Sequence, residues 1–99
     1  MFTIDRIKET IVPLIKDYPI RRVILFGSYA RGDATEKSDV DLIIDSEGQL
    51  SYWDLLGLIG HLVMKMPMEV DILGLEEVKK PDLLYNINSE GVIIYERTY

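Results

Sequence analysis

Short apolar runs that alternate with segments of helical periodicity constrain the fold of this 99-residue chain more than any other feature. Arg22–Phe26 and Val40–Asp45 are apolar, rich in β-branched residues and short, which is typical of buried strands. Residues 68–73 alternate apolar with acidic side chains, and residues 92–95 form a last apolar run. Because helical patterns separate these runs, the sequence predicts one α/β domain over residues 1–99, a small mixed β-sheet flanked by helices.

The first helix is predicted near the N-terminus. Thr3 can cap it, and its apolar positions recur every three or four residues, at Ile4, Ile7, Ile11 and Ile15. Pro13 lies inside this pattern and should kink the helix or split its last turn. A short helix is also expected around residues 81–87.

A longer helix is predicted over residues 55–63. Ser51, followed three residues later by Asp54, resembles a capping box just before it. Gly57 and Gly60 lie within this segment, and each weakens a helix by about 1 kcal/mol relative to alanine. We therefore expect both glycines to permit close packing.

For several other side chains around this helix, a structural role is the simplest interpretation. Trp53 is expected to pack in the core or at its edge. Met64, Met66 and Met68 are expected to fill the core, with a groove for a partner as the alternative. His61 is the only histidine and lacks a second metal ligand nearby in the sequence, so we expect a packed or surface residue.

Composition and charge exclude several classes of protein. The net charge of −6 argues against binding along a nucleic-acid backbone, which needs a basic surface. No apolar run approaches the roughly 20 residues of a membrane span, and the N-terminus lacks the pattern of a secretory signal. The absence of cysteine fits a reducing compartment. We expect a cytoplasmic protein that binds neither membrane nor nucleic acid.

A glycine-serine pair follows the first predicted strand. Gly27 has no side chain, so a phosphate can approach the backbone there, and Ser28 adds a hydroxyl. Free N–H groups at the start of a helix attract anions, and Arg31, one turn later, is placed to neutralise phosphate charge. The alternative is an ordinary turn, because Gly-Ser is common at strand ends.

Two aspartates flank a valine at the start of the second predicted strand. Side chains on a strand alternate between its faces, so Asp39 and Asp41 point the same way while Val40 enters the core. Neighbouring carboxylates repel each other unless a cation lies between them, and their oxygens suit Mg²⁺ or Mn²⁺. The alternative is a turn-capping aspartate beside one exposed strand residue.

A third carboxylate comes from the strand predicted over residues 68–73. Asp71 lies between Val70 and Ile72. If its strand neighbours the one that carries Asp41, all three acids can reach one metal site; otherwise Asp71 simply faces solvent.

Taken together, these motifs are far more specific than any one of them. Ten residues separate Ser28 from Asp39, which gives the pattern Gly-Ser-x10-Asp-x-Asp. With it the sequence resembles the minimal nucleotidyltransferases of the polymerase-beta-type superfamily, in particular the antitoxin of a HEPN/minimal-nucleotidyltransferase toxin–antitoxin pair. The residues that carry the resemblance are Gly27-Ser28-Tyr29-Ala30-Arg31-Gly32, Ser38-Asp39-Val40-Asp41-Leu42 and Val70-Asp71-Ile72.

The resemblance implies a role for each motif residue. Gly27 and Ser28 would hold the β- and γ-phosphates of a nucleoside triphosphate. Asp39 and Asp41 would bind two metal ions, and Asp71 would complete the site at which the acceptor hydroxyl loses its proton.

The resemblance also implies a substrate and a partner. In related antitoxins the nucleotide is ATP, and AMP is transferred to a tyrosine hydroxyl of the HEPN toxin, a reaction called AMPylation that silences the toxin. Larger relatives carry an added domain that grips the base or acceptor, so we expect a partner in a hetero-oligomer to supply that surface. Two alternatives remain: an antitoxin that neutralises by occlusion alone, and a nucleotidyltransferase acting on a small molecule or an RNA end.

Overall fold

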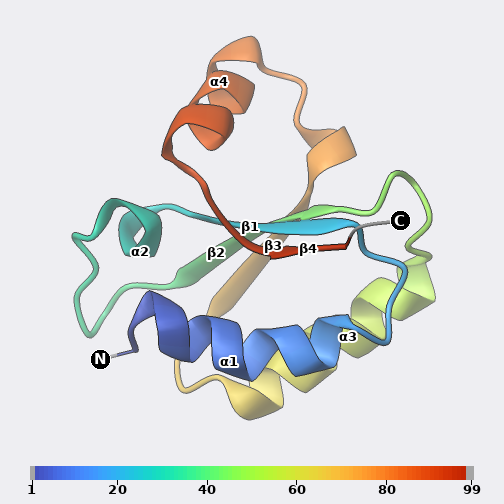
Figure 1. Ribbon diagram of the computed structural model, residues 1–99, viewed down its shortest axis with the longest axis horizontal. Helices are drawn as coiled ribbons and strands as arrows, with labels where there is room; N and C mark the ends of the chain where they lie inside the picture. Colours follow the sequence, from blue (N-terminus) through green and yellow to red (C-terminus); the bar gives the residue numbers. More distant parts are fainter. Residues whose placement is uncertain (1, 98–99) are drawn as a thin grey trace.

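The computed structural model describes residues 2–97, which form one four-stranded sheet with helices on both faces (Figure 1). The elements in chain order are α1 (Ile4–Ile15), β1 (Arg22–Phe26), α2 (Ser28–Arg31), β2 (Val40–Asp45), α3 (Tyr52–Lys65), β3 (Val70–Gly74), the 3-10 helix η1 (Leu75–Glu77), α4 (Pro81–Glu90) and β4 (Val92–Glu96). The strand order is β3-β2-β1-β4. β1 runs antiparallel to β2 and β4, whereas β2 and β3 are parallel. The predicted α/β fold with a mixed sheet is therefore confirmed.

The two faces of the sheet are covered differently, as Figure 1 shows, with α1 and α3 on one side and α4 on the other. The larger core lies under α1 and α3, and alternate strand residues point into it. A smaller core around Ile24, Ile43 and Ile87 lies under α4. No helix within residues 2–97 is long and apolar enough to span a bilayer.

α1 begins and packs as its sequence predicts. The Thr3 hydroxyl accepts a backbone N–H at 3.1 Å, and the isoleucines at 7, 11 and 15 are fully buried. Pro13 does not split the helix, which continues to Ile15. Because Pro13 lies in the last turn, its missing N–H removes a single bond, and the Lys16 N–H still donates to the Val12 carbonyl at 3.2 Å.

α3 starts three residues earlier than predicted, at Tyr52, because the Ser51 hydroxyl caps it by accepting a backbone N–H at 3.0 Å. A Cβ at Gly57 would lie 3.2 Å from the Tyr18 hydroxyl, so this glycine permits close packing as predicted. Gly60 does not, because a Cβ there would meet no atom within 4 Å.

The expectations for side chains on α3 were partly wrong. Met66 is buried, but Trp53 and Met64 are 79% and 84% exposed instead of packing in the core. They lie on the outer face of the helix, which no other described element covers. His61 is exposed and shares a hydrogen bond of 3.2 Å with the Tyr18 hydroxyl, so it is the surface residue that was expected.

Further boundaries differ from the sequence prediction: α4 continues to Glu90, three residues past its expected end, and one short element was not predicted. β3 begins at Val70, two residues late, because its parallel ladder with β2 starts where Val40 pairs with Val70. η1 was not predicted, since a three-residue helix has too few positions to show a periodic pattern. None of these differences moves Asp71 off its strand.

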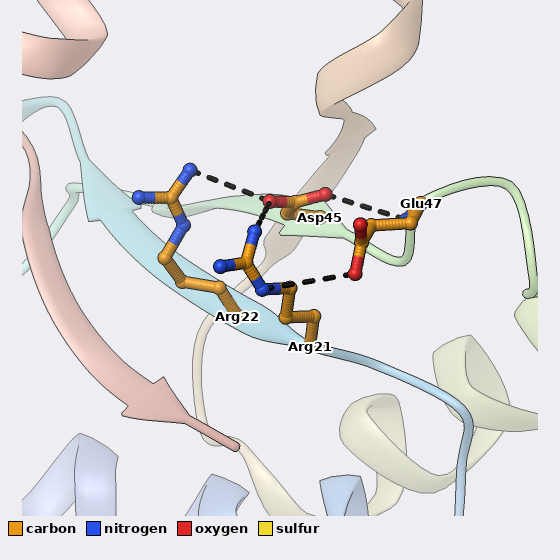
Figure 2. Close-up of polar contacts among 4 residues, drawn as sticks. All are labelled: Arg21, Arg22, Asp45 and Glu47. Atoms are coloured by element: carbon orange, nitrogen blue, oxygen red, sulfur yellow. Dashed lines mark hydrogen bonds and ion pairs between the residues drawn. The ribbon is translucent and has the colours of Figure 1, made fainter. Parts of the chain in front are cut away.

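A charged cluster ties β1 to β2 at the end of the strands remote from Gly27 (Figure 2). The Asp45 carboxylate, which is nearly buried, lies 3.3 Å from the Arg22 guanidinium and 4.0 Å from that of Arg21. It also accepts the backbone N–H of Glu47 at 3.3 Å. Glu47 in turn lies 3.7 Å from Arg21, but both of these side chains are largely exposed.

Replacing Asp45 by asparagine should destabilise the fold, because the half-buried Arg22 guanidinium loses its compensating charge. We expect the free energy of unfolding in urea to fall by about 1.5–3 kcal/mol, the range for a hydrogen bond to a charged group. The matched change Glu47→Gln removes an exposed pair and should cost less than about 0.5 kcal/mol. Equal effects of the two changes would contradict this ranking.

Candidate active site

The turn after β1 has a backbone conformation that only glycine adopts freely. Gly27 has φ 76° and ψ −151°, and it leads directly from the strand into the single turn of α2. The Arg31 N–H donates to the Gly27 carbonyl at 3.1 Å, which closes the turn. Ser28 is the first residue of α2, so the strand end, the glycine and the serine form one tight corner.

This corner lies against the carboxylate of Asp41. Phe26, the last residue of β1, is the register partner of Asp41 on β2. A Cβ at Gly27 would collide with Asp41 Oδ2. The absence of a side chain at residue 27 therefore does more than leave room for a phosphate, since it also lets the backbone approach the acid.

The acids on β2 and β3 lie side by side. Asp41 and Asp71 are direct register partners in the parallel ladder. Val40 is fully buried under α1 and α3, as predicted, which directs Asp41 to the opposite face of the sheet. Asp39 immediately precedes β2 and is half-buried. The condition set by the sequence, that the strand of Asp71 neighbours that of Asp41, is met.

The charges around Asp41 are mutually repulsive. Burial raises the pKa of the Asp41 carboxyl above its ordinary value, and the negative charges of Asp71 and Asp39 raise it further. The positive charge of Arg31 lowers the pKa but does not offset these effects. Arg31 also lies 3.3 Å from Asp33. The charges of Asp39, Asp71 and Arg31 thus all act on the Asp41 carboxyl.

The donor chemistry of these acids fits a divalent cation. Carboxylate oxygens are the ligands of Mg²⁺ and similar hard ions, and a bound cation would relieve the repulsion that raises the pKa of Asp41. Within residues 2–97, no three His, Cys, Asp or Glu side chains are gathered closely enough to enclose a metal by themselves. Mg²⁺ is usually held by one or two carboxylates together with substrate phosphates, so a magnesium site does not need three gathered protein ligands.

A cavity opens between these acids and α4. It has a volume of about 330 Å³ and includes Gly27, Asp41 and Asp71 in its lining. The remaining lining residues are apolar: Phe26, Leu42, Ile43, Ile72, Leu73 and Leu83. The pocket thus combines two acids with an apolar lining, which suits a substrate with a charged and a hydrophobic part.

Comparison with known proteins decides the family. The sequence model described as "Polymerase beta, Nucleotidyltransferase" matches residues 9–99. The chain belongs to the polymerase beta nucleotidyltransferase family. It is accordingly a nucleotidyltransferase, with a nucleotide substrate and the divalent metal usual for these enzymes.

Relatives of this nucleotidyltransferase match over most of their length. A candidate protein adenylyltransferase of Methanocaldococcus jannaschii is 31% identical over 95% of this chain and 100% of its own. The protein adenylyltransferase MntA of Thermococcus cleftensis is 31% identical over 74% of this chain and 78% of its own.

Solved structures show the same fold. A candidate minimal nucleotidyltransferase superposes with a TM-score of 0.76 and 28% identity, over 92% of this chain and 95% of that one. A toxin–antitoxin structure with AMP-PNP has the same TM-score at 22% identity, over 91% of this chain and 73% of that one, which establishes likeness of fold only.

The apolar wall of the nucleotidyltransferase pocket was missed in the sequence. Leu73 follows Asp71 by two residues, so strand alternation alone would have placed both on one face. Phe26 directly precedes Gly27, so its position in the sequence also indicated a place beside the site. No sequence signal indicated Leu83, because its position depends on how α4 packs over the sheet.

Proposed function

We propose that this nucleotidyltransferase transfers AMP from ATP to a hydroxyl of a partner protein, a tyrosine of a HEPN-domain toxin, and thereby acts as an antitoxin. The observation that carries the proposal is the register pairing of Asp41 with Asp71 beside the Gly27 corner. The names of its relatives support the acceptor class, since two of them are described as protein adenylyltransferases.

In this proposal the corner binds the phosphates of ATP, and the nearby acids bind the metal. Gly27 and Ser28 hold the β- and γ-phosphates, and Arg31 neutralises part of their charge. Asp39, Asp41 and Asp71 hold Mg²⁺ or Mn²⁺, which when bound would stabilise the charge that gathers on the phosphates during the reaction. Fixed charges placed in advance favour the transition state over the bound substrate.

The transfer itself needs a base and an acceptor in line with the α-phosphate. The acceptor oxygen forms a bond to the α-phosphorus while the bond from that phosphorus to the bridging oxygen breaks, and pyrophosphate leaves. The hydroxyl proton passes to the Asp71 carboxylate, which is exposed at the mouth of the pocket. The apolar wall formed by Leu73 and Leu83 suits the aromatic ring of a tyrosine better than a serine side chain.

The test is direct transfer of label. With ATP labelled at the α-phosphate, Mg²⁺ and a HEPN-domain toxin, we expect label on the toxin, and we expect none with γ-labelled ATP. A toxin that stays unlabelled while still being neutralised would replace this proposal with neutralisation by occlusion. Label on a small molecule or an RNA end, with none on protein, would assign a different acceptor.

A further inference from the structure

We propose that Ser38 is a positioning residue of the nucleotidyltransferase site, whose hydroxyl fixes the backbone from which Asp39 reaches the metal. The inference rests on the metal-binding role of Asp39 in the proposed function, and it extends that function to a residue with no part in it so far. Ser38 contacts neither substrate nor metal in this scheme and acts only through the main chain of the next residue.

Asp39 is held less directly than the other two acids of the site. Asp41 and Asp71 pair with each other in the ladder between β2 and β3, so the sheet fixes their backbone. Asp39 lies one residue before β2, at the end of the loop that joins α2 to β2 (Figure 1). Within residues 2–97, no hydrogen bond or ion pair holds the Asp39 carboxylate. Its direction therefore depends on the backbone of its two neighbours.

The neighbour on the strand side is firmly held. Val40 is fully buried in the larger core. Its N–H donates to the Glu69 carbonyl at 2.9 Å, where the pairing of β2 with β3 begins. This contact fixes only one side of Asp39, so the other side must be fixed within the loop.

Ser38 provides that second point by closing a tight turn over residues 35–38. The Ser38 N–H donates to the Thr35 carbonyl at 3.0 Å, and the Ser38 hydroxyl accepts the Thr35 N–H at 2.8 Å. Both backbone polar groups of Thr35 thus bond to Ser38, so residue 38 cannot shift without breaking one of these bonds. Serine hydroxyls that bond to a nearby backbone group commonly fix turns in this way.

The rest of the loop offers little support if this bond is lost. Ala34 packs against the larger core, but residues 32, 33 and 35–37 are exposed. Without the Ser38 hydroxyl, the Thr35 N–H can donate to water instead, and the turn keeps one backbone bond. We therefore expect residue 38, and Asp39 with it, to become less well placed while the fold is retained.

Thr35 offers a matched control within the same turn. Its hydroxyl accepts the Lys37 N–H at 3.2 Å, a bond of the same kind as that made by Ser38. Thr35→Ala removes this bond and a 3.5 Å contact between the two hydroxyls, but the Thr35 N–H still donates to Ser38. The two variants weaken one turn to a similar degree, and only Ser38→Ala removes the bond beside Asp39.

The test measures metal binding without any acceptor. Mn²⁺ is titrated against the protein in the presence of a non-hydrolysable ATP analogue, and unbound Mn²⁺ is followed by electron paramagnetic resonance. We expect Ser38→Ala to raise the dissociation constant for Mn²⁺ about tenfold, the lower end of the range for residues that orient metal ligands. Ser38→Thr, which keeps the hydroxyl, should restore the wild-type affinity, and Thr35→Ala should leave it unchanged.

Thermal unfolding separates this role from a purely structural one. Ser38→Ala and Thr35→Ala each lose an exposed hydrogen bond to a backbone N–H, so their melting temperatures should be nearly the same. A difference in Mn²⁺ affinity between two equally stable variants would then reflect the position of Asp39 and not the stability of the loop.

Three results would overturn the inference. Wild-type affinity in Ser38→Ala would show that the turn does not place Asp39, and it would leave the proposed function intact. Equal weakening in Ser38→Ala and Thr35→Ala would assign the effect to the turn as a whole. Absence of Mn²⁺ binding by the wild type, or unchanged affinity in Asp39→Asn, would instead remove the metal role of Asp39 and the proposed function with it.

Discussion

Asp41→Asn is expected to abolish nucleotidyl transfer, lowering the rate by at least about 10³-fold, the upper end for loss of one charge-stabilising group. A neutral amide is a much poorer metal ligand than a carboxylate, and Asp41 is the acid that contacts both the Gly27 corner and the partner strand. The measurement is release of labelled pyrophosphate with saturating ATP and acceptor. Asp39→Asn should have a similar effect, and Asp17→Asn, at an exposed loop residue, should have none.

The same Asp41 change should make the metal-free protein more stable. The folded state raises the pKa of Asp41, so folding disfavours its charged form, and the stability of the wild type falls as pH rises through that pKa. In the presence of a chelator, unfolding curves should show Asp41→Asn more stable than wild type near neutral pH. The difference should fade in acid, where the wild-type carboxyl is protonated in both states. A variant less stable than wild type at neutral pH would contradict the repulsion inferred at this site.

The strands could be predicted because local patterns decide them. Val40 and Asp41 show the reason: one is fully buried and the other faces the pocket, as period-two alternation requires. The parallel pairing of Asp41 with Asp71 could only be stated as a condition, because strand order depends on contacts between distant segments.

What the sequence could not reveal lies at surfaces made by two or more elements. Leu83 joins the pocket wall because α4 packs over the sheet, and nothing local to residue 83 indicates this. The sequence predicts Trp53 and Met64 in the core because apolar side chains usually enter it, whereas α1 and the sheet cover the opposite side of α3 and leave both residues exposed. The sequence likewise could not reveal that Gly60 permits no close packing, because this depends on the empty space around it.

Gly27→Ala is expected to cost both stability and activity, because two independent constraints meet at that residue. Its backbone conformation is one that side chains other than glycine rarely adopt, which costs about 1–3 kcal/mol, and the new methyl group would collide with Asp41 Oδ2. Either the corner or the carboxylate must move, and a displacement of about 1 Å at a reacting centre can lower the rate by about 10²-fold.

Gly48→Ala separates the two constraints on Gly27. Gly48 has a φ of 77°, almost identical to that of Gly27, but a Cβ there would meet nothing within 4 Å and the residue lies in the loop after β2, away from the pocket. It should therefore lose about 1 kcal/mol of stability and keep its full transfer rate. If Gly27→Ala behaves like Gly48→Ala, with a rate within about threefold of wild type, the close approach of the Gly27 backbone to Asp41 has no part in catalysis. A rate that falls about 10²-fold at residue 27 and not at residue 48 would assign the loss to the carboxylate that the new methyl group displaces, since a positive φ is common to both residues.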